Sequence, residues 1–245
     1  MENDNMPVIE YRGFRDLVYA EVLKDTPEEY STGEVKPLVP AGEIAKTIEQ
    51  SSATKFYDNL AALVINSRGA DTATLTTAVI PLGVQAEITG QYLDEETGAF
   101  AEGSFTKAKY FALGYKIGEV GDTGEGDDPE MYVWRYKGTF NIPDVAAKTR
   151  DAGTDSSGQQ LVYTGINTTH KFTKGGSAKA VAVRTADNKV DVSTFFDEVT
   201  DIDKLKPLHP EGEPGEPAGA PVGKTTGPND TPTKTEEPKT LKTAA

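Results

Sequence analysis

The sequence contains no cysteine, two histidines and one tryptophan among its 245 residues. Without cysteine the chain can form no disulfide, no thiolate metal site and no cysteine nucleophile. No apolar run reaches the roughly 18 residues that a membrane-spanning helix requires. The chain begins Met-Glu-Asn-Asp-Asn, which lacks the basic end and apolar stretch of a secretory signal. We therefore expect neither a secretory signal nor a membrane partner.

Basic residues are also scarce, with 25 Lys and Arg against 39 Asp and Glu and a net charge of −14. This charge balance argues against tight binding of nucleic acid, because such binding requires clustered Lys and Arg to neutralise the phosphates. Residues 207–245 hold eight of the 15 prolines, no aromatic residue and only −2 of the charge. They can bury too little apolar area to offset the entropy of ordering. We predict an N-terminal arm over 1–12, a β domain over 13–206 that carries −12, and a disordered Pro/Gly-rich tail over 207–245.

Strand signals dominate the predicted domain. Alternating or β-branched runs predict strands at about 16–23, 72–80, 108–117, 131–142, 160–172 and 178–185. Residues 30–42 are punctuated by Gly and Pro and predict a loop, whereas 43–57 fit either a helix or a strand. One helix is predicted from Pro81 to Gly90, because proline suits a first helical position and glycine suits a stop. One or two helical turns are expected at 193–199, with Ser193 or Thr194 as the cap.

The segment 131–142 carries most of the aromatic signal. Tyr132, Trp134, Tyr136, Phe140 and Ile142 share one parity, and a period of two predicts that they lie on one face of a sheet. Such a stripe is typical of a core. The alternative is a surface that stacks sugars or bases.

No motif points to catalysis. His170 is the only histidine of the predicted domain, lies in the predicted 160–172 strand and has no nucleophile motif beside it. The loop at 121–130 supplies five carboxylates that could bind calcium, but Thr123 and Gly124 break the EF-hand order and favour a solvated loop. Residues 151–155 are a weaker case of the same kind. We therefore predict no catalytic, cofactor-binding or metal-binding residue, no cofactor and no enzymatic activity.

Five segments, in order, resemble the major tail proteins (tail tube proteins) of long, non-contractile-tailed bacteriophages, particularly those that infect Gram-positive hosts. They lie at 13–22, 37–44, 80–100, 110–117 and 131–144, and the strongest blocks read LGVQAEITG and YVWRYKGTF. The resemblance covers roughly 13–185. The chain departs from the family pattern in its longer acidic connection at 118–130, in 146–160, and in 207–245, which has no counterpart.

The resemblance implies a mainly β fold of two packed antiparallel sheets in a sandwich or barrel-like arrangement, with one flanking α-helix and long inter-strand loops. It implies hexameric rings that stack into a hollow tube, through which double-stranded DNA passes at ejection without specific binding. The polar connection at 47–71 becomes an arm that reaches a neighbouring ring, and inward-facing acidic groups would repel DNA phosphates. The 207–245 tail is expected to project outside the tube.

The resemblance also implies three other partners, which are the tape measure, distal tail and tail terminator proteins. It implies that the protein is located in the virion tail after synthesis in the cytoplasm of the bacterial host. Two alternatives stay open. One is another ring-forming tail or baseplate component, and the other is a β-sandwich carbohydrate-binding or adhesion module that uses Trp134 and its neighbours.

Overall fold

The computed structural model describes residues 8–103, 109–121, 129–147 and 158–208. The chain divides into two units, Met1–Pro210 and Glu211–Ala245, and every described residue belongs to the first. Most of the predicted acidic loop (122–128), the segment 151–155 and nearly all of the predicted tail (209–245) lie outside the described residues. Residue 207, the first of that predicted tail, forms an isolated β-bridge with Val190 inside the first unit.

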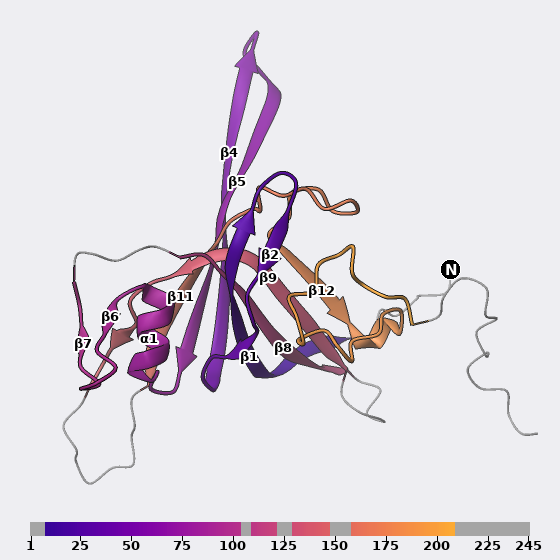
Figure 1. Cartoon of the computed structure of the whole chain (residues 1–245). Coiled ribbons are helices and arrows are strands. Elements are labelled where there is room, and N and C mark those ends of the chain that lie inside the picture. The colour runs from indigo at the N-terminus through magenta and orange to yellow at the C-terminus, as the bar shows by residue number, and fades with distance from the viewer. Residues whose placement is uncertain (1–7, 104–108, 122–128, 148–157, 209–245) are drawn as a thin grey trace, which may run out of the picture. The chain divides into compact units, whose positions relative to one another are not determined.

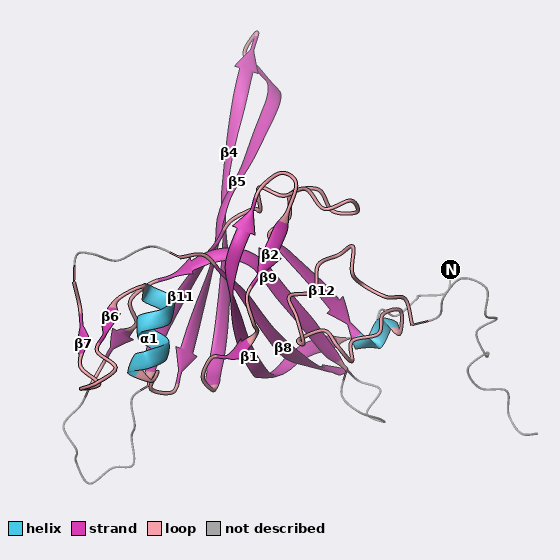
Figure 2. Ribbon diagram, in the orientation of Figure 1, coloured by secondary structure: helices cyan, strands magenta, loops and turns pink. Residues whose placement is uncertain are grey.

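The described unit is built on one large antiparallel sheet (Figures 1 and 2). Its strand order is β2 (Tyr30–Thr32), β1 (Ile9–Asp25), β8 (Phe111–Gly121), β9 (Glu130–Phe140), β11 (Gln159–Gly165), β5 (Leu60–Thr77) and β4 (Ala41–Tyr57). Three short strands join it from the side: β3 (Lys36–Pro37) on β1, β12 (Ala180–Arg184) on β9, and β10 (Asp144–Val145) on β11. A second sheet consists of β6 (Tyr92–Leu93) and β7 (Phe100–Ala101), and the helices are α1 (Leu82–Thr89) and the 3-10 turn η1 (Thr185–Asp187). The predicted mainly β class, with antiparallel sheets and one α-helix, is confirmed.

Two apolar clusters occupy the two faces of the large sheet. The first packs β1, β5, β8 and β11 against α1, which contributes Ile88. The second packs β9 and β12 against the chain after Val190, which contributes Phe195 and Val199. Successive residues of β8 alternate between them, since Leu113 belongs to the first cluster and Ala112 to the second. The prediction that this strand is covered on both faces is therefore confirmed.

The aromatic stripe of β9 does not stay on one face, so that prediction is wrong at its far end. Trp134 and Tyr136 lie in the second cluster, but Phe140 lies in the first. The cause is a β-bulge: Leu113 pairs with Arg135, yet Phe111 pairs with Gly138, so β9 carries one extra residue that reverses its parity. Trp134 is fully buried and its indole N–H donates to the carbonyl oxygen of Phe195 at 2.8 Å. The interpretation of the stripe as core is confirmed at this residue.

The helix signals had mixed outcomes. The predicted helix after Pro81 is confirmed, and Gly90 ends it in the left-handed conformation (φ 71°). The helical turns predicted at 193–199 are instead consecutive turns with i→i+3 hydrogen bonds, such as Phe195 N–H to the Val192 oxygen at 3.1 Å. Their first N–H is capped by neither Ser193 nor Thr194, because Asp191 accepts a hydrogen bond from the backbone N–H of Ser193.

Several strand boundaries also differ from the predictions for a common reason: hydrogen bonding to another strand, which the sequence of one strand does not show, decides where each strand begins and ends. Residues 9–12 of the predicted arm belong to β1, where Tyr11 pairs with Glu119. The predicted 30–42 loop contains β2 and β3, which both pair with β1. The ambiguous segment 43–57 is part of β4 and pairs with β5. The predicted 160–172 strand, by contrast, ends early at Gly165.

Candidate assembly hairpin and its buried root

The outer halves of β4 and β5 form a hairpin, residues 50–68, that extends beyond the rest of the large sheet (Figure 1). Its register runs from Gln50 opposite Arg68 to Tyr57 opposite Leu60. The two-residue turn of Asp58 and Asn59 has positive φ at both positions (50° and 65°), which is the geometry of a tight type I′ hairpin. The connection predicted at 47–71 is therefore an ordered two-stranded arm.

The end of this hairpin, residues 56–65, is called the apolar tip below. It exposes six large apolar side chains, each between 48% and 72% accessible: Phe56, Tyr57, Leu60, Leu63, Val64 and Ile65. Large apolar side chains that are exposed singly are normal on a protein surface, but six of them within ten residues are an unusual concentration. Such concentrations mark surfaces that bind another protein or a membrane.

Both faces of the tip are apolar. Directly opposed residues of a hairpin share a face, so the pair of Thr54 and Val64 lies on the face opposite to the adjacent pair of Lys55 and Leu63. A register shift after Lys55 leaves Ala62 as an extra residue. Since neither face of the tip is covered by the described part of the chain, its apolar side chains are available to a partner.

The hairpin leaves the sheet at a buried ionic cluster, called the root, that consists of Asp71, Arg135 and Lys179. It lies where β9 exchanges neighbours: β12 pairs with β9 up to Arg135, and β11 pairs with it from Gly138 onward. A β-bulge in β5 falls at the same place, because Ile48 pairs with Asp71 and Gln50 already pairs with Arg68. The root therefore lies between β11 and β12, at the point along β9 where these two strands diverge.

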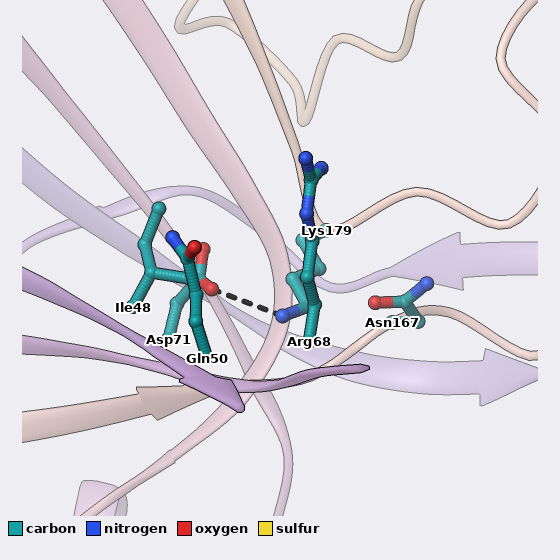
Figure 3. Close-up of a pocket in the computed structure, with 6 residues that line it drawn as sticks. All are labelled: Ile48, Gln50, Arg68, Asp71, Asn167 and Lys179. Carbon is teal, nitrogen blue, oxygen red and sulfur yellow. Dashed lines mark hydrogen bonds and ion pairs between the residues drawn. The ribbon is translucent and has the colours of Figure 1, made fainter. Parts of the chain in front are cut away.

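Asp71 is the centre of the root. The Arg135 Nη1 atom lies 3.3 Å from Asp71 Oδ2. The Lys179 Nζ atom lies 2.9 Å from Asp71 Oδ1 (Figure 3). Lys179 also donates to the carbonyl oxygen of Gly69 within the bulge, and the Arg135 Nε–H donates to the Tyr115 hydroxyl oxygen at 3.4 Å. Burial alone would raise the pKa of Asp71, but hydrogen bonds and attraction from Lys179 and Arg135 outweigh it and hold that pKa below its ordinary value.

A polar cleft of about 460 Å³ opens beside the root (Figure 3). Its lining residues come from the hairpin base, β5 and the chain between β11 and β12: Ile48, Gln50, Arg68, Asp71, Asn167 and Lys179. Its one carboxylate, Asp71, is already engaged by Arg135 and Lys179, and the Lys46 Nζ atom lies 4.0 Å from Asp71 Oδ2 as well. We therefore interpret the root as a structural ion-pair cluster that fixes the direction in which the hairpin leaves the sheet.

The residues considered for chemistry from the sequence do not converge on the root. His170 lies in a bend rather than in the predicted strand; its Nδ1 atom is 3.2 Å from the carbonyl oxygen of Pro27 and its backbone N–H donates to Asp25 Oδ1. At the described end of the acidic loop, Glu130 forms an ion pair with Arg15. Within 8–103, 109–121, 129–147 and 158–208, no three His, Cys, Asp or Glu residues are grouped so as to hold a metal ion.

Sequence reasoning missed the root because its members are distant in the chain. Asp71 is 64 residues from Arg135 and 108 from Lys179. The available signal was a single arginine at the centre of the aromatic run YVWRY. A charged residue whose neighbours on both sides are buried aromatics must have a buried partner.

Among the described helices, none is long and apolar enough to cross a membrane. No protein-family model matches the chain, and no curated protein matches it significantly.

Proposed function

We propose that the chain is a structural virion protein, the major tail or tail tube subunit of a long-tailed bacteriophage. In this proposal it self-assembles into rings, hexameric by family resemblance, that stack into the tube conducting double-stranded DNA during ejection. The observation that carries the proposal is the hairpin of residues 50–68, whose apolar tip has no partner within the described chain. The five resembling segments and the mainly β fold with one helix support the same assignment.

The free edge of the large sheet is a second support. Strand β4 has 17 residues and pairs on one side with β5, while its other edge pairs with no strand of the described chain. Long unpaired edges invite pairing with another chain and are normally avoided in monomers. In a ring they become the positions at which neighbouring subunits join, because a contact that closes by rotation generates a ring.

The charge fits the passage of DNA. The net charge of −14 lies mostly in residues 1–206. If part of it faces the channel, it repels phosphates and DNA moves without adhering. A channel lined mainly by Lys and Arg would contradict this part of the proposal.

Another ring-forming tail or baseplate component is the second candidate, because the same hairpin and free edge would serve a single ring. Tubes distinguish the two, since a terminator or baseplate ring does not polymerise. The carbohydrate-binding alternative depended on an accessible Trp134, whose indole is buried and hydrogen-bonded to Phe195.

Negative-stain electron microscopy of the purified chain tests the proposal. We expect hollow tubes from the wild type and none from Leu63→Asp, which places a carboxylate in the apolar tip. Ser67→Asp is the matched control, because it adds the same charge to an exposed polar position of the hairpin in β5 rather than in the edge strand β4, and it should leave the tubes intact. A wild type that stays monomeric at high concentration would overturn the assignment.

A further inference from the structure

The polar cleft beside the root has more cationic than anionic side chains around it. Its one carboxylate, that of Asp71, is in contact with the cations of Arg135 and Lys179. The ammonium of Lys46 lies 4.0 Å from the same carboxylate. A fourth cation, Arg68, lines the cleft at the base of the hairpin. A chain whose net charge is −14 thus concentrates positive charge at this cleft.

A second carboxylate nearby reduces this excess without removing it. The Glu49 side chain lies over Gly69, with its carboxylate at the position where a side chain of residue 69 would begin. Among the described residues that line the cleft or contact Asp71 or Gly69, four side chains are cations and two are carboxylates, which leaves a local charge of +2. Cations that lack enough counter-charge repel one another, and an anion that enters the cleft removes this repulsion.

The cleft also has hydrogen-bond donors that the described chain leaves available. The Arg68 guanidinium carries five N–H groups, and no carboxylate of the described chain lies within ion-pair distance of it. The Lys179 ammonium donates to two oxygen atoms of β5, which leaves one of its three N–H groups. The Asn167 amide donates to the carbonyl oxygen of Ser177 at 3.4 Å and keeps a second N–H. These three donor side chains line the same cleft (Figure 3).

We propose that the cleft binds a small tetrahedral oxyanion, phosphate or sulfate, with Arg68, Lys179 and Asn167 as its donors. A dianion balances the local charge of +2, whereas a single carboxylate group balances half of it. Guanidinium and ammonium groups suit such ions, because charge-assisted hydrogen bonds are short and strong. The volume of about 460 Å³ accommodates the ion together with several waters, each of which occupies about 30 Å³ in the liquid.

The charge of the whole chain favours a free ion over the backbone of a nucleic acid. A nucleic acid approaches with many phosphates at once, and a chain of net charge −14 repels it, whereas a small ion enters the cleft alone. The inference goes beyond the proposed function, because the cleft lies within one copy and requires neither rings nor DNA.

A bound ion joins the hairpin to the body of the subunit. Gln50 and Arg68 are the first opposed pair of the hairpin, whereas Asn167 and Lys179 belong to the chain between β11 and β12. An ion held from both sides restrains the hairpin base, in addition to the contacts that Lys179 already makes with β5. Backbone amides of residues 66–70 should therefore exchange more slowly with deuterium when the ion is bound.

Isothermal titration calorimetry of the full chain with sodium phosphate, near neutral pH and at constant ionic strength, tests the site. We expect one phosphate per chain, bound at least about tenfold more weakly by Arg68→Gln, because a charge-assisted contact is lost. Lys55→Gln is the matched control, since it removes the same charge from an exposed position of the hairpin outside the cleft and should bind like the wild type. Sodium acetate should give no binding in the same titration.

Glu49→Gln gives a test in the opposite direction. It removes the nearby carboxylate and raises the local charge from +2 to +3, so phosphate should bind several-fold more tightly. A damaged fold does not produce tighter binding, which separates this result from loss of structure. Hydrogen–deuterium exchange supplies the location: phosphate should slow exchange at residues 66–70 in the wild type and in Lys55→Gln but not in Arg68→Gln.

Three results would overturn the site. The first is a phosphate titration of the wild type without a heat of binding, and the second is equal phosphate affinity in the wild type and Arg68→Gln. The third is a short oligothymidylate that binds more tightly than phosphate and depends on Arg68, which would assign the cleft to nucleic acid. None of these results bears on tube formation, which electron microscopy tests separately.

Discussion

The root offers the sharpest prediction about stability. Asp71→Asn removes the carboxylate but keeps the shape of the side chain. The guanidinium of Arg135, whose side chain is 2% accessible, then stays buried with a positive charge. Its other side-chain hydrogen bond within the described residues is the 3.4 Å contact to the Tyr115 hydroxyl, which is neutral. We therefore expect the variant to be much less stable than the wild type.

The magnitude follows from the burial of the partners. Breaking a buried ion pair by removing one member costs about 3–5 kcal/mol, because the remaining charge is uncompensated. That is a large part of the about 5–15 kcal/mol by which a folded domain is stable. The matched control is Glu29→Gln, since the Lys24–Glu29 pair is more than half exposed on both sides and such pairs contribute about 0–1 kcal/mol.

Urea unfolding followed by Trp134 fluorescence measures both variants. The experiment belongs in the Leu63→Asp background, because self-association would otherwise add its own free energy to that of folding. The double variant Asp71→Asn, Arg135→Met should recover part of the loss, because it removes the uncompensated guanidinium from the interior and leaves only Lys179, whose side chain is 21% accessible. A loss below about 1 kcal/mol for Asp71→Asn, no larger than for Glu29→Gln, would refute our interpretation of the root.

The same carboxylate sets a pH dependence. Its folded-state pKa lies below the ordinary value of 3.8, so its contribution to stability is fully present above that value and is lost as the pH falls through the folded-state pKa. The difference in free energy of unfolding between wild type and Asp71→Asn should therefore be constant near neutral pH and should narrow below about pH 4. A difference that grows on acidification would have the wrong sign.

Three further predictions concern packing, the tail and charge. Gly138→Ala should lower the free energy of unfolding by about 1–3 kcal/mol, because the new Cβ would overlap the Tyr163 ring and the backbone of β11. In the same urea assay the control Gly42→Ala, whose Cβ meets no atom within 4 Å, should change that free energy little. Deleting 211–245 should leave tube formation visible by negative stain, since that segment is too poor in apolar residues to build an interface; loss of tubes would reverse this view. Raising the salt concentration from about 50 to about 500 mM should lower the critical concentration for assembly measured by light scattering, because salt screens the repulsion between copies of charge −14. A higher critical concentration would show that charge repulsion does not limit assembly.

Features encoded in a short stretch of sequence were predictable. Pro81 and Gly90 set the limits of α1 through the missing N–H of proline and the left-handed φ of glycine, both of which act within one helical turn. The double burial of β8 was visible because both of its parities are apolar. In each case the cause and the signal lie in the same ten residues.

Features that depend on pairing with another strand were not. Phe140 lies on the other face of the sheet than predicted because β9 has a bulge opposite β8, and no residue type in β9 indicates that bulge. The segment 43–57 became a strand because β5 pairs with it along its length, although its own spacing fitted a helix equally well. The root forms where β5, β9 and the residue before β12 come together. The sequence pattern of any one of these segments does not indicate that they meet.

The acidic charge and the apolar tip have opposite effects on the association of two copies, and the hairpin separates the two effects in space. A chain of net charge −14 repels its own copies at long range, and an apolar patch attracts them at short range. Carrying the patch on an arm places it beyond most of the charged body, so a neighbour meets the tip before it meets the repulsive surface. The arm works only if its direction is fixed, and the buried root of Asp71, Arg135 and Lys179 at its base supplies that rigidity. In the proposed assembly, the stability of the fold and the formation of tubes both depend on this one ionic cluster, so a variant that weakens the root should impair tube formation before it unfolds the subunit.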